Sequence, residues 1–183
     1  MVLEESKLQG VVGALLMAIG SAFPLIGIVG VALMLRAFKV VAEYYGENDM
    51  FRGVLRGLTA YLIGFIAFSA IYIYAAYAWY VRLMTLTIGL KTFLVPLLGG
   101  LIIVLIVVFA CYLIGALLLR RSLEVLSFRS GEVLFSVAWL LLLIGAATSV
   151  IVMGFVITAI AWTIMAIAFY SLRPKPQVVK ATP

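Results

Sequence analysis

Hydrophobic and charged residues separate sharply along this chain. Four stretches, residues 8–35, 57–81, 92–119 and 133–172, contain no Asp, Glu, Lys or Arg. A helix that crosses a bilayer needs roughly 20 mostly apolar residues, so each stretch is long enough for at least one such helix. The pattern predicts an all-α fold, namely a polytopic integral membrane helical bundle.

The last charge-free stretch is too long for one membrane helix. Its 40 residues would form a helix about 60 Å long, which is about twice the thickness of a bilayer core. We therefore expect the chain to fold back within residues 145–149, Gly-Ala-Ala-Thr-Ser, which are small or compatible with a turn.

The first stretch allows two interpretations. It can form one tilted helix kinked at Pro24, or a hairpin that turns between Gly20 and Pro24, because proline suits the first turn of a helix. The pattern Leu-Leu-x-x-Ile-Gly-x-Ala at residues 15–22 recurs at 140–147, and a shift of two residues then aligns Gly27 with Gly154. This internal repeat favours the hairpin, hence six transmembrane helices, with five as the alternative.

The six predicted helices form one transmembrane domain over residues 1–172, followed by a short basic cytoplasmic tail at 173–183. They cover residues 7–22, 24–46, 50–81, 92–126, 131–147 and 150–172. With both termini in the cytoplasm, only Arg82 and Lys91 of the 13 basic residues lie outside. Cytoplasmic loops are enriched in Lys and Arg, so this orientation is predicted. Five spans would move only Lys7 outward.

Composition supports a membrane rather than a nucleic-acid partner. The chain is 67% hydrophobic and 11% charged, whereas a soluble domain is about 45–50% apolar and about 25% charged. The net charge of +6 is not a basic patch, because all seven acids lie in the segments that hold most of the basic residues. We predict a multi-pass protein of the cell membrane, with the lipid bilayer, a membrane-protein partner or a second copy as partners.

The residue inventory argues against enzymatic chemistry. The chain has no His and a single Cys, Cys111, within an apolar run. Ser69, Ser136, Thr158 and Thr163 are available as nucleophiles within the apolar runs, but no base accompanies them. No charged residue lies at the centre of a predicted span, as proton relays and ion pathways require. The sequence predicts no enzyme, no cofactor and no metal site.

The most structured polar segment is residues 36–56. Lys39 and Glu43 have the i,i+4 spacing of a helical ion pair, and Gly46 is placed to end their helix. Asn48 or Asp49 can cap the next helix, whose first turn holds Arg52. The tight turn predicts that the two helices are antiparallel neighbours. The acidic residues here do not have the spacing of a calcium loop.

Aromatic residues mark the outer end of the third predicted helix: Tyr72, Tyr74, Tyr77, Trp79 and Tyr80. Aromatic rings are enriched at the headgroup level of membranes, so a belt is the favoured interpretation. A stacking site for a ligand is the alternative.

A family resemblance rests on three segments. They are the glycine-rich first run with Gly20, the turn Pro24-Leu-Ile-Gly27, and Lys39-x-x-x-Glu43-Tyr-Tyr-Gly46-Glu-Asn-Asp-Met-Phe-Arg52; the paired apolar helices at the C-terminus also fit. With these features the chain resembles the mainly archaeal integral membrane proteins known as domain of unknown function 996. The resemblance covers most of residues 8–172 and implies a multi-span fold. It implies no catalytic or binding residues.

Together these features favour a non-enzymatic membrane protein that acts as an accessory or scaffolding subunit of a membrane assembly, or as a homo-oligomer. The alternative is a small transporter or channel for a neutral or apolar solute, built on a helix broken at Pro24. The residues singled out are turn and cap candidates: Gly20, Pro24, Gly27, Lys39, Glu43, Gly46, Asp49 and Arg52.

Overall fold

The described part of the chain is entirely helical apart from its turns. The computed structural model describes residues 2–85, 90–149 and 152–172. Its helices are α1 (Val2–Gly20), α2 (Pro24–Tyr45), α3 (Asn48–Thr85), α4 (Leu90–Ser130), α5 (Leu134–Ala147) and α6 (Val152–Ser171). The six expected helices are therefore present, and residues 2–45 form a hairpin rather than one kinked helix. The predicted tail at 173–183 lies outside the described residues.

Most helix ends differ from the sequence-based boundaries by a few residues, the largest difference being α1, which begins at Val2 rather than at 7. Two of the differences have identifiable reasons. Helix α4 continues beyond residue 126 to Ser130, because Leu123 and Leu126 keep one side of it buried while Arg120 pairs with Glu124 on the other side, with Nε and Oε1 2.9 Å apart. Helix α5 begins at Leu134 rather than at 131, because Gly131 has a φ of 73°, which is incompatible with a right-handed helix.

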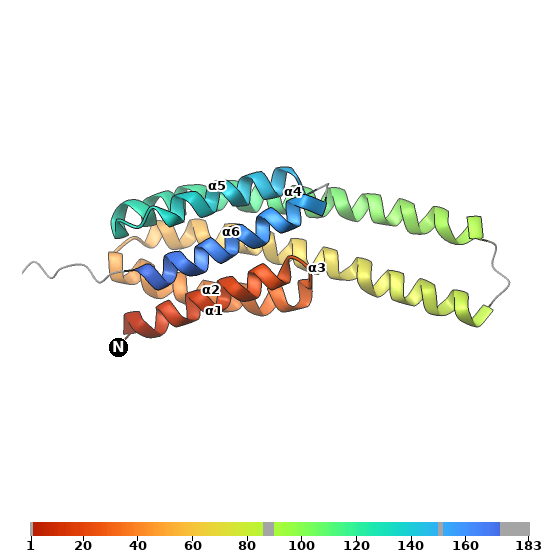
Figure 1. Ribbon diagram of the computed structural model, residues 1–183, viewed down its shortest axis with the longest axis horizontal. Helices are drawn as coiled ribbons and strands as arrows, with labels where there is room; N and C mark the ends of the chain where they lie inside the picture. Colours follow the sequence, from red (N-terminus) through yellow and green to blue (C-terminus); the bar gives the residue numbers. More distant parts are fainter. Residues whose placement is uncertain (1, 86–89, 150–151, 173–183) are drawn as a thin grey trace, which may run out of the picture.

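The six helices form a closed ring of three antiparallel hairpins. Each helix packs on the next one in the chain, and α1 also packs on α6 (Figure 1). The hairpins are α1–α2, α3–α4 and α5–α6. The start of α1, the end of α6 and the two connections between hairpins gather at one end of the ring, which we call the charged end (Figure 1).

The glycines that the internal repeat aligns lie at close helix contacts in both short hairpins. In α1–α2, a Cβ added to Gly20 would lie 2.4 Å from the Cα of Gly27. In α5–α6, a Cβ added to Gly145 would lie 3.2 Å from the carbonyl oxygen of Gly154. Only glycine permits so close an approach of two backbones. The aligned glycines thus hold equivalent places beside the turns of the two hairpins.

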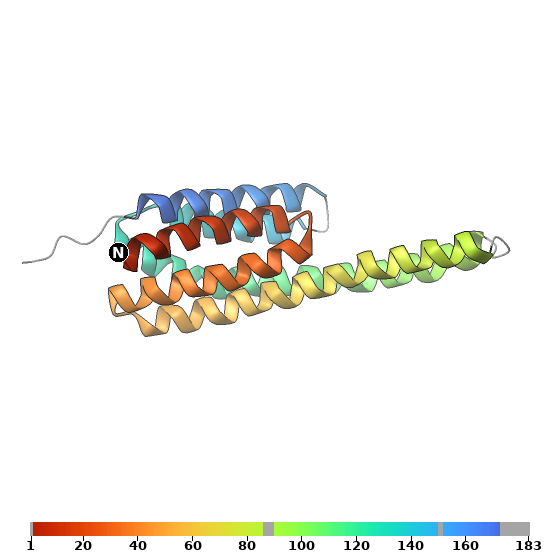
Figure 2. The same cartoon turned by 90° about the horizontal axis from the view of Figure 1, so that it is seen from below.

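The middle hairpin is about twice as long as the others. Helices α3 and α4 contain 38 and 41 residues, or about 57 and 61 Å at about 1.5 Å per residue. The four shorter helices run alongside only half of this length (Figure 2). The rest of α3–α4 lies beyond Ser69 and Val108, the outermost buried residues described on the two helices. This part, residues 70–85 and 90–107, is called the projecting hairpin.

Large side chains fill the inside of the ring. Phe38 and Phe135 both contact Phe169 edge-on, with ring centroids 5.0 and 5.4 Å from it. Tyr61 stacks on Tyr112 at 5.1 Å. Four described segments are long and apolar enough to cross a membrane: Pro24–Tyr45, Asn48–Val81, Leu98–Ser130 and Met153–Ser171, whereas Leu134–Ala147 is apolar but shorter.

Candidate functional site

The predicted turn residues hold three helices together rather than forming a broken helix. Helix α1 ends at Gly20, and Pro24 is the first residue of α2. Gly27 lies against the ring of Phe65 on α3, where an added Cβ would be 2.7 Å from the ring. The backbone N–H groups of residues 21–23 donate to carbonyl groups of α1 at 3.0–3.2 Å. The turn is therefore closed by its own hydrogen bonds.

A small apolar hollow lies beside this turn. It has a volume of about 190 Å³ and is lined by Phe23, Pro24 and Leu25 of the turn and by Ser69 and Ile73 of α3. The Ser69 hydroxyl donates to the Phe65 carbonyl oxygen of its own helix at 2.8 Å. The hollow therefore suits hydrocarbon better than a polar ligand.

The connection between α2 and α3 follows the expected glycine-ended form. Gly46 has a φ of 71°, its N–H donates to the Glu43 carbonyl oxygen at 3.2 Å, and the Glu47 N–H donates to the Ala42 carbonyl oxygen at 2.9 Å. These two bonds are the Schellman arrangement that closes a helix.

The side chains around this connection pair differently from the sequence-based expectation. Asp49 lies inside the first turn of α3 and contacts Arg52, with Oδ1 and Nη1 3.4 Å apart. Lys39 and Glu43 are both exposed, and the ion pairs found in the described part of the chain do not join them. The predicted Lys39–Glu43 pair and Asp49 cap are therefore corrected. An exposed pair contributes little once solvent screens it.

An unpredicted ion pair links the α2–α3 connection to the end of α4. Arg129, near the end of α4, contacts Glu47, which follows Gly46. The pair closes the charged end between residues 82 positions apart in sequence. No local pattern in the sequence signals this pair, because its partners are so far apart in the chain.

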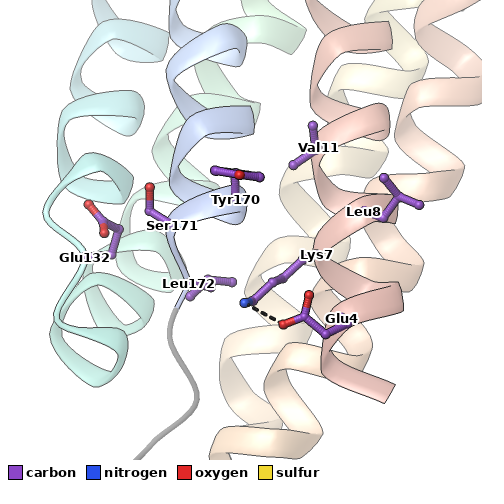
Figure 3. A pocket seen from close by; sticks show the side chains of 8 residues that line it. All are labelled: Glu4, Lys7, Leu8, Val11, Glu132, Tyr170, Ser171 and Leu172. Carbon is purple, nitrogen blue, oxygen red and sulfur yellow. Dashed lines mark hydrogen bonds and ion pairs between the residues drawn. The ribbon is translucent and has the colours of Figure 1, made fainter. Parts of the chain in front are cut away.

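A groove opens at the charged end between the start of α1 and the end of α6 (Figure 3). Its volume is about 840 Å³, and it is lined by Glu4, Lys7, Leu8, Val11, Glu132, Tyr170, Ser171 and Leu172. Lys7 is only 16% exposed and pairs with Glu4, with Nζ and Oε1 2.9 Å apart. Figure 3 shows this pair on one side of the groove and Glu132 on the other. Apolar walls with charges at the edges are typical of protein contacts.

Apolar side chains continue from this groove along the outside of α1 and α6. We call this surface the apolar flank, and it comprises the exposed residues Leu8, Val12, Ile160, Ile167 and Tyr170. The opposite outer side of the ring, formed by α2, α3 and α4, also has exposed apolar side chains, among them Tyr44, Leu55 and Phe128. In addition it carries exposed basic residues at Arg36, Lys39, Arg52, Arg56, Arg120 and Arg121. The ring is therefore asymmetric in charge.

Within the described part of the chain, three buried polar side-chain groups inside the ring have no hydrogen-bond partner. They are the hydroxyls of Tyr61 and Tyr112 and the indole N–H of Trp162. Tyr61 contacts both other rings, at 5.1 and 5.5 Å between centroids. The sequence did not single out this cluster, because all three residues lie in apolar runs, where the pattern indicates ordinary core residues. Their role here is packing.

Three of the four hydroxyls considered as nucleophiles are bound within their own helices. Ser69 donates to Phe65 at 2.8 Å, Thr158 to Gly154 at 2.8 Å and Thr163 to Ala159 at 2.9 Å, each through the carbonyl oxygen. Within the described ranges, no three His, Cys, Asp or Glu side chains gather as a metal site. The geometry thus offers packing surfaces more readily than a reaction centre.

Comparisons with known proteins give a family but no activity. Residues 26–163 match the family described as "Protein of unknown function (DUF996)". The chain is 26% identical over 175 residues to a protein of Methanocaldococcus jannaschii printed as "Uncharacterized protein MJ1644", and the alignment covers 94% of each chain. No solved structure matches the chain significantly.

Proposed function

The chain belongs to the DUF996 family of proteins of unknown function, and from its own surfaces we propose that it is a non-enzymatic, multi-pass membrane protein that scaffolds a membrane assembly. It acts either as an accessory subunit of that assembly or as a homo-oligomer. The cell membrane is its proposed location, with the charged end in the cytoplasm, because 11 of the 13 basic residues then lie inside.

The apolar flank is the observation that carries this proposal. Toward the charged end, Arg36 and Lys39 are exposed on α2, whereas Ile167 and Tyr170 are exposed on α6. A bilayer surrounds a protein on all sides, so it cannot cover one side of an untilted ring and leave the other in water. A protein partner can cover one side alone, and contiguous exposed apolar patches mark such contacts.

The filled interior of the ring favours a scaffold rather than a solute channel. Trp162, Tyr61, Tyr112 and Phe65 are almost completely buried between α3, α4 and α6. A solute path through the ring would have to displace these aromatic side chains. A path for an apolar solute is the second candidate, and the hollow beside Pro24 is the feature that favours it. That hollow ends against the close packing of Gly20, Gly27 and Phe65.

Purification from native membranes in mild detergent tests the scaffold. We expect the protein to purify with a stoichiometric partner or as a multimer. Tyr170→Glu should disrupt that complex, because it buries a charge in the contact. Tyr44→Glu is the matched control, because Tyr44 is also exposed but lies on α2, away from the flank. A monomer without partners at every detergent concentration would contradict the scaffold, and solute flux into proteoliposomes would support the transporter instead.

A further inference from the structure

Three exposed arginines, Arg36, Arg56 and Arg120, mark one level on the outside of the ring. A Cβ added to Gly57 would lie 2.6 Å from Leu119, so the adjacent residues Arg56 and Arg120 lie at similar heights. The Arg120 guanidinium lies 4.9 Å from the centroid of the Trp139 ring on α5. Arg36 is about as far from the Gly46 turn along α2 as Arg56 is along α3. We call this height the basic level.

From the basic level, α3 has the apolar length of a complete bilayer crossing. Residues 57–76 number 20 and carry no charge, which gives about 30 Å of helix, the thickness of a hydrocarbon core. Tyr77, Trp79 and Tyr80 follow and are exposed, as expected of rings at the far headgroups. Helix α4 is also free of charge from residue 92 to residue 119.

The short hairpins end well before that far side. Above Arg36, α2 has only residues 24–35, about 18 Å of helix, and above Trp139, α5 has only residues 140–147, about 12 Å. Phe155, near the start of α6, stacks on Phe68 of α3 at 5.3 Å, and Phe68 is about 18 Å above Arg56. By these lengths the α1–α2 turn lies roughly 12 Å short of the outer headgroups, and the α5–α6 turn lies roughly 12–18 Å short of them.

The two turns have the chemistry that a position inside hydrocarbon demands. A polar group exposed to lipid must find its partner within the protein. Ser21 donates to the Met17 carbonyl oxygen at 3.3 Å, Thr148 to that of Ile144 at 2.8 Å and Ser149 to that of Ala146 at 2.8 Å. At the tip of the first turn, Phe23 is 62% exposed, whereas a turn that faces water is ordinarily polar.

From these heights we infer that α3–α4 alone crosses the whole bilayer, while α1–α2 and α5–α6 enter from the charged side and end inside it. This inference rests on the membrane placement in the proposed function. Lipid chains of the far leaflet fill the step above the two turns and pack against the projecting hairpin. The hollow formed by Phe23, Leu25 and Ile73 is the part of this step that receives a lipid chain.

The exposed basic residues on the outer side of α2, α3 and α4 agree with this placement. Arg36, Lys39, Arg56 and Arg121 are exposed and have no ion pair within the described ranges. All four lie at or just below the basic level, where anionic headgroups of the near leaflet would meet them. The same headgroups fix the depth of the ring, because arginine is costly to move into hydrocarbon.

Depth measurement with single cysteines tests the inference. In a Cys111→Ala background, a fluorophore is attached at Ala22→Cys or Ala147→Cys, both at exposed positions beside the turns, in vesicles of phosphatidylcholine and phosphatidylglycerol. Lipids with a nitroxide near the terminal methyl group should quench both sites more strongly than lipids with a nitroxide at the headgroup. A membrane-impermeant maleimide should label neither site from either side of the vesicle. Ala76→Cys, exposed on the projecting hairpin, should instead be quenched most by headgroup nitroxides.

The outcomes separate this inference from the proposed function. Strong impermeant labelling of Ala22→Cys and Ala147→Cys from the outside would mean six complete spans and would overturn the inference, while leaving a membrane scaffold intact. Lack of quenching at all three sites would contradict the proposed location of the protein in a membrane. Quenching of Ala22→Cys only in monomeric protein would show that a second copy, rather than lipid, fills the step, which also overturns the inference.

Discussion

At the residue scale, glycines decide how closely the helices approach, because they have no side chain to keep two backbones apart. Gly20 and Gly27 bring two backbones into direct contact, and Gly27 also makes room for the Phe65 ring. Gly46 and Gly131 serve a different purpose, because their positive φ ends one hairpin and begins the next. These two uses of glycine account for the position of each hairpin in the ring.

Replacement of Gly20 by alanine should separate α1 from α2. The added Cβ would lie 2.4 Å from the backbone of Gly27, so the helices must move apart, at a cost of about 1–3 kcal/mol. Thermal unfolding in detergent measures this loss. Gly99→Ala is the matched control, since an added Cβ there meets nothing within 4 Å, and its stability should stay equal or rise. Equal stability of the two variants would contradict the packing described here.

Removal of the buried tyrosine hydroxyls should not destabilise the ring. The hydroxyls of Tyr61 and Tyr112 have no partner, and an unsatisfied buried polar group costs about 1–3 kcal/mol. Tyr61→Phe and Tyr112→Phe should therefore leave the midpoint of thermal unfolding unchanged or raise it. A clear fall in both variants would show that the hydroxyls bind something, and would reopen the interior as a functional site.

At the element scale, hairpins are the units of this fold, and charge locates their ends. The two short hairpins turn at the end of the ring away from the charged end, and the two connections at the charged end carry Glu47 and Glu132 next to their glycines. The Glu47–Arg129 contact then joins the α2–α3 connection to the end of α4. The short connections hold neighbouring hairpins close together, and packing between the hairpins then stabilises the ring.

The Glu47–Arg129 pair should contribute measurably, unlike the exposed pair nearby. Its side chains are 25% and 46% exposed, so a double-mutant cycle with Glu47→Gln and Arg129→Gln should give a coupling of about 0.5–1 kcal/mol. The same cycle on Asp49 and Arg52, which are 94% and 74% exposed, should give a coupling close to zero. Equal couplings would mean that the connection is held by packing alone.

Local signals predicted the helices well but not their lengths or partners. Pro24, Gly46 and the small residues at 145–149 placed the turns, because each has a local backbone preference that tertiary contacts do not override. The contact of α1 with α6 and the Glu47–Arg129 pair depend on residues far apart in sequence, which no local pattern reveals. The Lys39–Glu43 pair failed because i,i+4 spacing permits an ion pair but supplies little energy to hold it.

At the scale of the whole molecule, two lengths define the protein. A ring of six helices reaches as far as the short hairpins, and α3–α4 continues for about as far again (Figure 2). The charge-free runs predicted helices in both parts, and the proposed depth would make only α3–α4 a complete crossing. The heights of Arg36, Arg56 and Trp139 relate the step between the two lengths to the thickness of a bilayer.

The central claim is that α3–α4 crosses a bilayer with the charged end on the cytoplasmic side. Labelling of single cysteines in intact cells, in a Cys111→Ala background, tests it most directly. The exposed sites Leu83 and Arg121 lie on opposite sides of the proposed crossing. Leu83→Cys should react with an impermeant maleimide from outside, and Arg121→Cys only after permeabilisation. Reaction of both sites from the same side would contradict the crossing.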